Sequence, residues 1–335
     1  MIKKLFLALI FVTTVTAVVG FYYYQQYQQF LLQPVFAQEK ILEIKKGQNF
    51  TEFTHNILSK QANGKPWMWR LFAKLEKVGG WLKVGEFKIS QDDTPIRMME
   101  KIKNNKVLTY HFTIVEGLNW RELKAKILAN DTLIHEVGDL SDEQLLKLLD
   151  SDKATPEGLF LPETYQFVRG DSDVDLLKRA HRALIQGLEK QWQSRDANLP
   201  YKTSYQLLIM ASIVEKETSL ASEREIVSGV FVRRLQKNMR LQTDPTVIYG
   251  LGEKYDGDIR AKDLKTDTPY NTYTRKGLTP TPIAMASMES IIASAHPKQG
   301  SALYFVANNR GGHYFSDTYE QHLKAVKDYL KGKKL

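Results

Sequence analysis

Residues 207–218 read Leu-Leu-Ile-Met-Ala-Ser-Ile-Val-Glu-Lys-Glu-Thr, an apolar run that ends in two glutamates. At about 100° per residue, this spacing predicts a helix in which Glu217 lies at the centre of an apolar arc, with Met210 and Ile213 beside it. Glu215 falls on the other side of the helix, where we expect water to reach it more easily. The position of Glu217 is therefore the unusual one.

A carboxyl group that packs against apolar neighbours keeps its proton to a higher pH, because burial disfavours the charged form. Such a group can donate a proton near neutral pH, so Glu217 is a candidate general acid. A structural interpretation stays open, in which Glu217 pairs with a buried arginine or ends a frayed helix. Helical periodicity alone does not decide between these alternatives.

The composition limits the classes of protein and of site. The chain has 335 residues, of which 43% are hydrophobic and 11% aromatic, enough for folded cores. It has no cysteine, which excludes disulfides, thiolate metal sites and a cysteine nucleophile. Its seven histidines show no HExxH or similar spacing, so we expect no metal site and no cofactor. The net charge of +9 suits an anionic lipid, an acidic polymer or nucleic acid.

The N-terminus carries Lys3 and Lys4, followed by an uncharged, mainly apolar run from Leu5 to Tyr24. About 20 helical residues match the hydrocarbon thickness of a bilayer, so residues 1–24 are predicted to form a cytoplasmic N-terminus and a transmembrane anchor. A cleaved signal peptide is the alternative, but the run is long for a signal core and ends in three tyrosines, typical of an interfacial belt. The lysines predict a cytoplasmic N-terminus, which argues against nucleic acid as a partner.

The rest of the chain divides into three parts, and together they predict an α+β protein. Residues 25–40 form a Gln-rich juxtamembrane spacer. Residues 41–117 alternate short strands with helices and predict a small module. Residues 118–335 predict a helical connector and a larger mixed α+β domain. The expected helices of this last part are 120–128, 141–149, 173–194, 203–218 and 221–237.

Residues 241–315 interleave polar and aromatic side chains with weak periodicity. Loops of this composition are costly to fold unless they build a site. Tyrosine rings, amides and hydroxyls are groups that line carbohydrate clefts. This segment therefore indicates a carbohydrate-binding loop region.

Two blocks, ASIVEKET at 211–218 and LQTDPTVIYG at 241–250, resemble the endolytic murein transglycosylases of the YceG-like family. The resemblance covers essentially the whole chain, including the anchor and the small module, which is LysM-like in that family. It continues at residues 270–273, 277–278, 295–297, 304–306 and 312–313. One departure follows Leu278, where Ala286 and Ser287 replace the usual Pro-Gly, so the resemblance does not predict the conformation of that loop.

The resemblance implies a lytic transglycosylase, a lyase that cuts nascent peptidoglycan strands internally between N-acetylmuramic acid and N-acetylglucosamine. The products carry 1,6-anhydromuramic ends, and strand elongation stops. The resemblance also implies a single-pass protein of the bacterial inner (cytoplasmic) membrane, with its catalytic domain in the periplasm. Peptidoglycan synthases are the family-based candidate partners.

The family's catalytic glutamate matches Glu217. It would protonate the glycosidic oxygen and then take the proton of the C6 hydroxyl that closes onto C1, so no second carboxylate is needed. Glu163 and Asp244 are the candidates for a second acid, which a muramidase-type hydrolase would use. An anchored peptidoglycan-binding scaffold is the non-enzymatic alternative. The candidate substrate contacts are Gln242, Asp244, Tyr249, Asn271, Thr272, Tyr273, Glu163 and His313.

Overall fold

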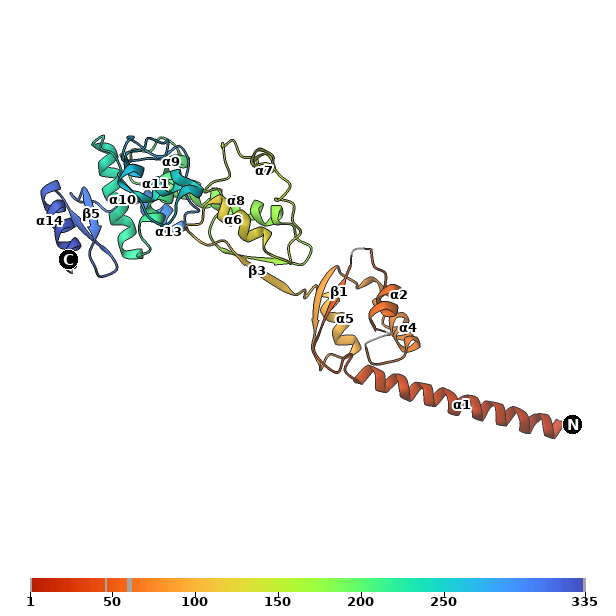
Figure 1. Cartoon of the computed structure of the whole chain (residues 1–335). Coiled ribbons are helices and arrows are strands. Elements are labelled where there is room, and N and C mark those ends of the chain that lie inside the picture. The colour runs from red at the N-terminus through yellow and green to blue at the C-terminus, as the bar shows by residue number, and fades with distance from the viewer. Residues whose placement is uncertain (1, 46, 59–61, 334–335) are drawn as a thin grey trace. The chain divides into compact units, whose positions relative to one another are not determined.

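The computed structural model describes residues 2–45, 47–58 and 62–333 (Figure 1). Helices dominate these residues, and their strands form three two-stranded sheets, β1-β2, β3-β4 and β5-β6. The predicted α+β class is thus confirmed. The chain divides into two compact units, one of Met1–Tyr110 with Phe167–Gly170 and one of His111–Gln166 with Asp171–Leu335.

The first unit begins with α1 (Ile2–Leu32), which is 31 residues long. Within the described part of the chain, this helix alone is long and apolar enough to cross a membrane. Its apolar side chains are exposed as far as Tyr24, whereas Tyr27 and Phe30 are buried in the unit. The exposed portion coincides with the predicted anchor.

The rest of the first unit packs a small sheet against short helices. Strands β1 (Lys40–Ile44) and β2 (Gly85–Ile89) pair antiparallel. Trp69, Phe72 and Phe87 are fully buried at its centre. The helical elements are α2 (Phe50–Phe53), η1 (Thr54–Leu58), α4 (Pro66–Leu75), η2 (Val78–Gly80) and α5 (Pro95–Lys103). The LysM-like assignment of this unit stays a prediction.

The second unit is built around α9 (Ser204–Glu217). Four helices contact it: α8 (Asp173–Ser194), α10 (Ala221–Gln236), α11 (Asp244–Leu251) and α13 (Met288–Ala295). The other elements of this unit are α6 (Trp120–Leu128), α7 (Asp142–Leu148), η3 (Gly252–Lys254), α12 (Ala261–Lys265), β5 (Tyr304–Ala307), β6 (His313–Ser316) and α14 (Tyr319–Leu330). Strands β3 (Thr109–Thr113) and β4 (Thr164–Val168) each have residues in both units.

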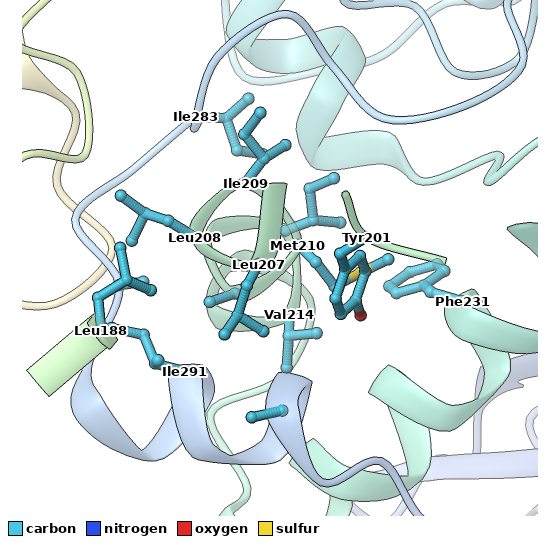
Figure 2. Close-up of a cluster of buried hydrophobic side chains, with 14 of the residues drawn as sticks. Leu188, Tyr201, Leu207, Leu208, Ile209, Met210, Val214, Phe231, Ile283 and Ile291 are labelled. Atoms are coloured by element: carbon cyan, nitrogen blue, oxygen red, sulfur yellow. The ribbon is translucent and has the colours of Figure 1, made fainter. Parts of the chain in front are cut away.

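Figure 2 shows apolar side chains from α8, α10 and α13 around α9, among them Leu188, Phe231 and Ile291. Leu207 and Met210 of α9 are fully buried. Burial of one such side chain stabilises the fold by about 1.5–3 kcal/mol, so the packing of α9 contributes to the stability of this unit.

The expectation that Glu215 faces water is wrong. Its side chain is 3% exposed, because helices cover α9 on several sides rather than along one stripe. The predicted exposure of Glu215 assumed that only one face of the helix is buried. A central helix is buried on several faces. Glu217, at the end of the helix, is the less buried of the two glutamates.

Residues 241–315 are also more regular than their weak periodicity predicted. They contain α11, α12, α13 and the antiparallel hairpin of β5 and β6. These helices have five to eight residues, too few for periodicity to show, and packing against α9 and α10 holds α13 in place. Ser287, one of the two residues that replace Pro-Gly, caps the N-terminus of α13 by accepting from the Ser290 N–H.

Candidate active site

Glu217 is the last residue of α9, and its side chain lines a cleft of about 450 Å³. The cleft lies among α9, α10, the start of α11, the β5-β6 hairpin and α14. The residues that line it are Glu217, Arg234, Leu241, Gln242, Thr243, Asp244, Tyr273, Tyr304, Phe305, Val306, Ala307, His313, Tyr319, His322 and Val326.

The surroundings of Glu217 favour its protonated form. Burial raises the pKa of this carboxyl above its usual range, and the nearby charge of Asp244 adds to the rise. The Thr243 hydroxyl donates to Glu217 Oε2 at 2.5 Å, and this bond lowers the pKa in part. The charge of Arg234, and that of His313 when its ring is protonated, act in the same direction. A half-buried carboxyl with a raised pKa at a cleft wall is suited to donate a proton.

The loop before α11 places the Thr243 hydroxyl. Gln242 adopts a left-handed backbone conformation, with φ of 51°, which costs a residue other than glycine about 1–2 kcal/mol. The loop is held by the Gln242 N–H, which donates to the Thr272 carbonyl at 3.2 Å, and by Arg234, which donates to the Leu241 carbonyl at 2.7 Å. Strained backbone of this kind is concentrated at functional sites.

Asp244 and Tyr273 form a second polar pair in the cleft. The Tyr273 hydroxyl donates to Asp244 Oδ1 at 2.5 Å. Asp244 is the first residue of α11, where the helix dipole favours a negative charge. The structure thus brings a carboxylate other than Glu217 into the same cleft.

His313 on β6 also lines the cleft. Its Nδ1 lies 2.7 Å from Glu223 Oε2, so the ring has a fixed carboxylate partner. Of the residues predicted as substrate contacts, Gln242, Asp244, Tyr273 and His313 are therefore brought together with Glu217.

The other four predicted contacts do not line this cleft. Asn271 is buried, and its amide donates to three carbonyls of residues 263–266, which holds the loop together. Thr272 is buried and hydrogen-bonds Thr246. Glu163 is exposed next to β4 and is not among the residues that line the cleft. Tyr249 lines a different cavity.

That second cavity, of about 340 Å³, is lined by a carboxyl group that was not predicted as a site residue. Glu157 is 3% exposed, and both its oxygens accept from the Trp120 N–H, at 3.0 and 3.1 Å. The Tyr249 hydroxyl donates to it at 3.0 Å. Burial raises the pKa of Glu157 from the ordinary value of 4.5 to about 7. No helical pattern marks this position, because Glu157 lies in a loop.

The first cleft also has an aromatic wall, whose residues were not among the predicted substrate contacts. Tyr304 stacks on His322, with ring centroids 5.3 Å apart, and contacts Tyr319 at 5.8 Å. Flat exposed rings suit the faces of sugars. The amphipathic pattern of 319–330 could have predicted α14, but only the tertiary structure places it at the cleft. In the part of the chain that the structure describes, no group of three or more His, Asp or Glu is arranged to hold a metal ion.

Comparison with known proteins gives one consistent family. A protein of Bacillus subtilis named endolytic murein transglycosylase is 34% identical over 243 residues, which cover 67% of this chain and 66% of that protein. A Streptococcus pneumoniae protein of the same name is 31% identical over 183 residues, 53% of this chain and 33% of its own length. The matches thus span less than two thirds of these relatives.

A solved structure gives the same result for the fold. The crystal structure of a YceG-like protein of Listeria monocytogenes aligns with a TM-score of 0.53 at 28% identity, and the alignment covers 86% of this chain and 98% of that one. The model of the YceG-like family matches residues 42–328. The chain belongs to the YceG-like family.

Proposed function

We propose that this protein is an endolytic murein transglycosylase that cuts peptidoglycan strands between N-acetylmuramic acid and N-acetylglucosamine and leaves 1,6-anhydro ends. The observation that carries the proposal is the half-buried Glu217 at the wall of the 450 Å³ cleft, with a raised pKa and a hydroxyl partner. The names of the B. subtilis and S. pneumoniae relatives support the reaction class.

In the proposed mechanism, protonated Glu217 gives its proton to the glycosidic oxygen as the bond to C1 breaks with oxocarbenium character. The C6 hydroxyl of the same sugar then closes onto C1, and its proton returns to the Glu217 carboxylate. No water is consumed. Gln242 and Tyr273 bind sugar hydroxyls in this cleft, and the rings of Tyr304 and Tyr319 stack on sugar faces.

A muramidase-type hydrolase is the second candidate, favoured by the presence of Asp244 in the same cleft. In that reaction Asp244 would activate a water molecule, and the products would carry reducing ends. The hydrogen bond from Tyr273 to Asp244 supports the lytic route, because it occupies one carboxylate oxygen. Glu163 is exposed and does not line the cleft, so it supports neither the lytic nor the hydrolytic route.

We further propose that α1 anchors the protein in the cytoplasmic membrane, with the N-terminus inside and the cleft outside. The length of α1 and the lysines that precede its apolar run support this topology. A protein anchored there meets new glycan strands first, so peptidoglycan synthases are the proposed partners. Accessibility of reporter fusions at each terminus tests the topology.

The activity is tested with the full-length protein in detergent and purified glycan strands. We expect products lighter by one water molecule than hydrolysed ends, as read by mass spectrometry, and none from Glu217→Gln. Asp244→Asn serves as the matched comparison, because a lytic enzyme keeps its anhydro products in this variant. Hydrolysed ends from the unmodified protein would establish the muramidase instead.

A further inference from the structure

We infer that His313 is a further catalytic residue of the cleft, oriented by Glu223 so that its free ring nitrogen takes the proton of a substrate hydroxyl. This inference rests on the proposed function and concerns its second step, in which the C6 oxygen closes onto C1.

Glu223, in the first turn of α10, holds His313 at two points. Its Oε1 accepts from the His313 backbone N–H at 2.7 Å, and its Oε2 lies 2.7 Å from the ring Nδ1. The hydroxyl of Thr218, the residue after Glu217, donates to Glu223 Oε2 at 3.3 Å. The histidine and glutamate side chains are 18% and 11% exposed. One carboxylate thus fixes the end of α9 and the start of β6 in a single arrangement.

Packing fixes the plane of the His313 ring as well. Phe305 contacts the ring edge to face, with centroids 5.2 Å apart, and Phe315 lies at 6.3 Å. The backbone before the ring approaches Glu223 so closely that a Cβ atom on Gly312 would lie 2.5 Å from Glu223 Oε1. Glycine at position 312 is therefore required for this contact.

The geometry decides the role of the second ring nitrogen. A histidine whose Nδ1 donates to a carboxylate carries its proton there, so the lone pair is on Nε2. In the described part of the chain, Nε2 of His313 has no hydrogen-bond partner, and the residue lines the same cleft as Glu217. A fixed imidazole with a free Nε2 is the arrangement of an oriented general base.

His322 provides the contrast within the cleft. It also lines the wall, but its Nδ1 is buried without a hydrogen-bond partner and no described carboxylate orients it. Its ring stacks on Tyr304 instead. His322 is therefore suited to the aromatic wall and His313 to proton transfer.

The step balances without any co-reactant. Glu217 protonates the leaving oxygen, the C1–O bond breaks and the C6 oxygen bonds to C1. The C6 hydroxyl proton passes to Nε2 of His313, and the imidazolium then returns it to the Glu217 carboxylate. Both residues recover their starting protonation. The other titratable groups that line the cleft are Arg234 of α10, Asp244 of α11, Tyr273, Tyr304 of β5, and Tyr319 and His322 of α14.

The test measures the release of anhydro ends across pH by the full-length protein in detergent. The variants are His313→Gln, which cannot accept a proton, and Glu223→Gln, whose amide can donate to Nδ1 and so moves the ring proton to Nε2. The control is His296→Gln, because His296 has a similar carboxylate partner, Asp196 at 2.8 Å, but lines none of the described cavities.

We expect the maximal rate to fall about 100-fold or more in both cleft variants and to stay unchanged in His296→Gln. The decline of the rate at acid pH should disappear in His313→Gln, since no base remains to be protonated. Strand binding, measured in a Glu217→Gln background, should stay unchanged. If the His313→Gln protein does not fold, Glu223→Gln tests the role of His313 instead. Glutamine has the size of glutamate and keeps an oxygen that accepts from the His313 N–H.

A rate within about threefold of the control, with the acid decline intact, would overturn the role of His313 and leave the assignment of Glu217 standing. The role of His313 would also be overturned if the variants lost stability and strand binding but kept an unchanged pH profile. That result is expected if His313 and Glu223 have only a structural role. Hydrolysed ends from the unmodified protein would instead refute the proposed function itself.

Discussion

Glu215 and Glu217 lie two residues apart at the end of α9, yet their carboxylates have different partners. Glu215 accepts from the Ser287 N–H at 2.9 Å and lies 3.7 Å from the Arg224 guanidinium, so it joins α9 to the start of α13 and to α10. Glu217 accepts from Thr243 and lines the cleft. The first carboxylate is part of the structural framework, and the second is available to a substrate.

Replacing Glu215 should therefore affect folding rather than chemistry alone. In Glu215→Ala, Arg224 keeps a charge that is 14% exposed without its partner, and the Ser287 N–H loses its acceptor. We expect a loss of about 3 kcal/mol of unfolding free energy, measured by chemical denaturation. Glu217→Gln is the control and should lose no stability, because it removes a carboxylate that burial disfavours. Equal losses in the two variants would contradict the division of roles.

Thr243→Val should move the pH dependence of the reaction. The Thr243 hydroxyl stabilises the Glu217 carboxylate and so lowers a pKa that burial has raised. Without it the pKa rises further, and the alkaline limb of the rate profile, where the acid loses its proton, should shift to higher pH. The maximal rate should fall about three- to tenfold as the acid loses its positioning.

The control for this measurement is Thr266→Val. Thr266 is exposed at the end of α12, and its hydroxyl donates only to the Lys262 carbonyl among the described contacts. Its rate profile should match that of the unmodified protein. An alkaline limb that stays in place in Thr243→Val would show that Glu217 is not the titrating acid.

Glu157 should make the stability of the second unit pH-dependent. Its pKa is about 7 in the folded protein against an ordinary 4.5, so between these values the folded state binds more protons than the unfolded state. Stability must then fall as pH rises through this window, by up to about 3 kcal/mol. Glu157→Gln cannot ionise and should remove this decline, which thermal unfolding at several pH values can measure.

Glu163→Gln is the matched control for Glu157→Gln, because it alters an exposed glutamate only six residues away along the loop. The decline with pH should persist in it. If Glu157→Gln retains the decline as well, the carboxyl responsible lies elsewhere.

Truncation of a core side chain on α9 measures how much the packing of this helix contributes to the unfolding free energy. Met210 is fully buried and lies within the cluster drawn in Figure 2. Met210→Ala should lose about 2–5 kcal/mol of unfolding free energy, through lost burial and the cavity left behind. Ile185→Ala on α8, where the side chain is 46% exposed, should lose much less. Similar losses would mean that α9 is not central to stability.

The local pattern of apolar and capping residues predicted many of the helices. The helices 120–128 and 173–194 have the bounds that their apolar spacing and flanking residues indicate. These segments are long or sharply bounded, so side-chain periodicity and capping are sufficient. The exposed apolar length of α1 likewise follows from composition alone.

The placement of the site residues required the tertiary structure. Gln242, Tyr273 and His313 come from three separate segments and meet in one cleft, whereas Asn271 and Thr272, next to Tyr273 in the sequence, point into the protein. Neighbours in an irregular loop can face opposite directions, because no fixed repeat relates them.

The sequence by itself determined that the end of α9 carries a carboxyl group among apolar residues and that a long apolar helix begins the chain. Only the tertiary structure decided which glutamate is covered, because Glu215 meets the start of α13 and Arg224 of α10, whereas Glu217 lines the cleft. It likewise joined Glu223 to His313, 90 residues apart, through contacts between α10 and β6. Burial and long-range hydrogen bonds depend on packing between segments, which local spacing does not encode.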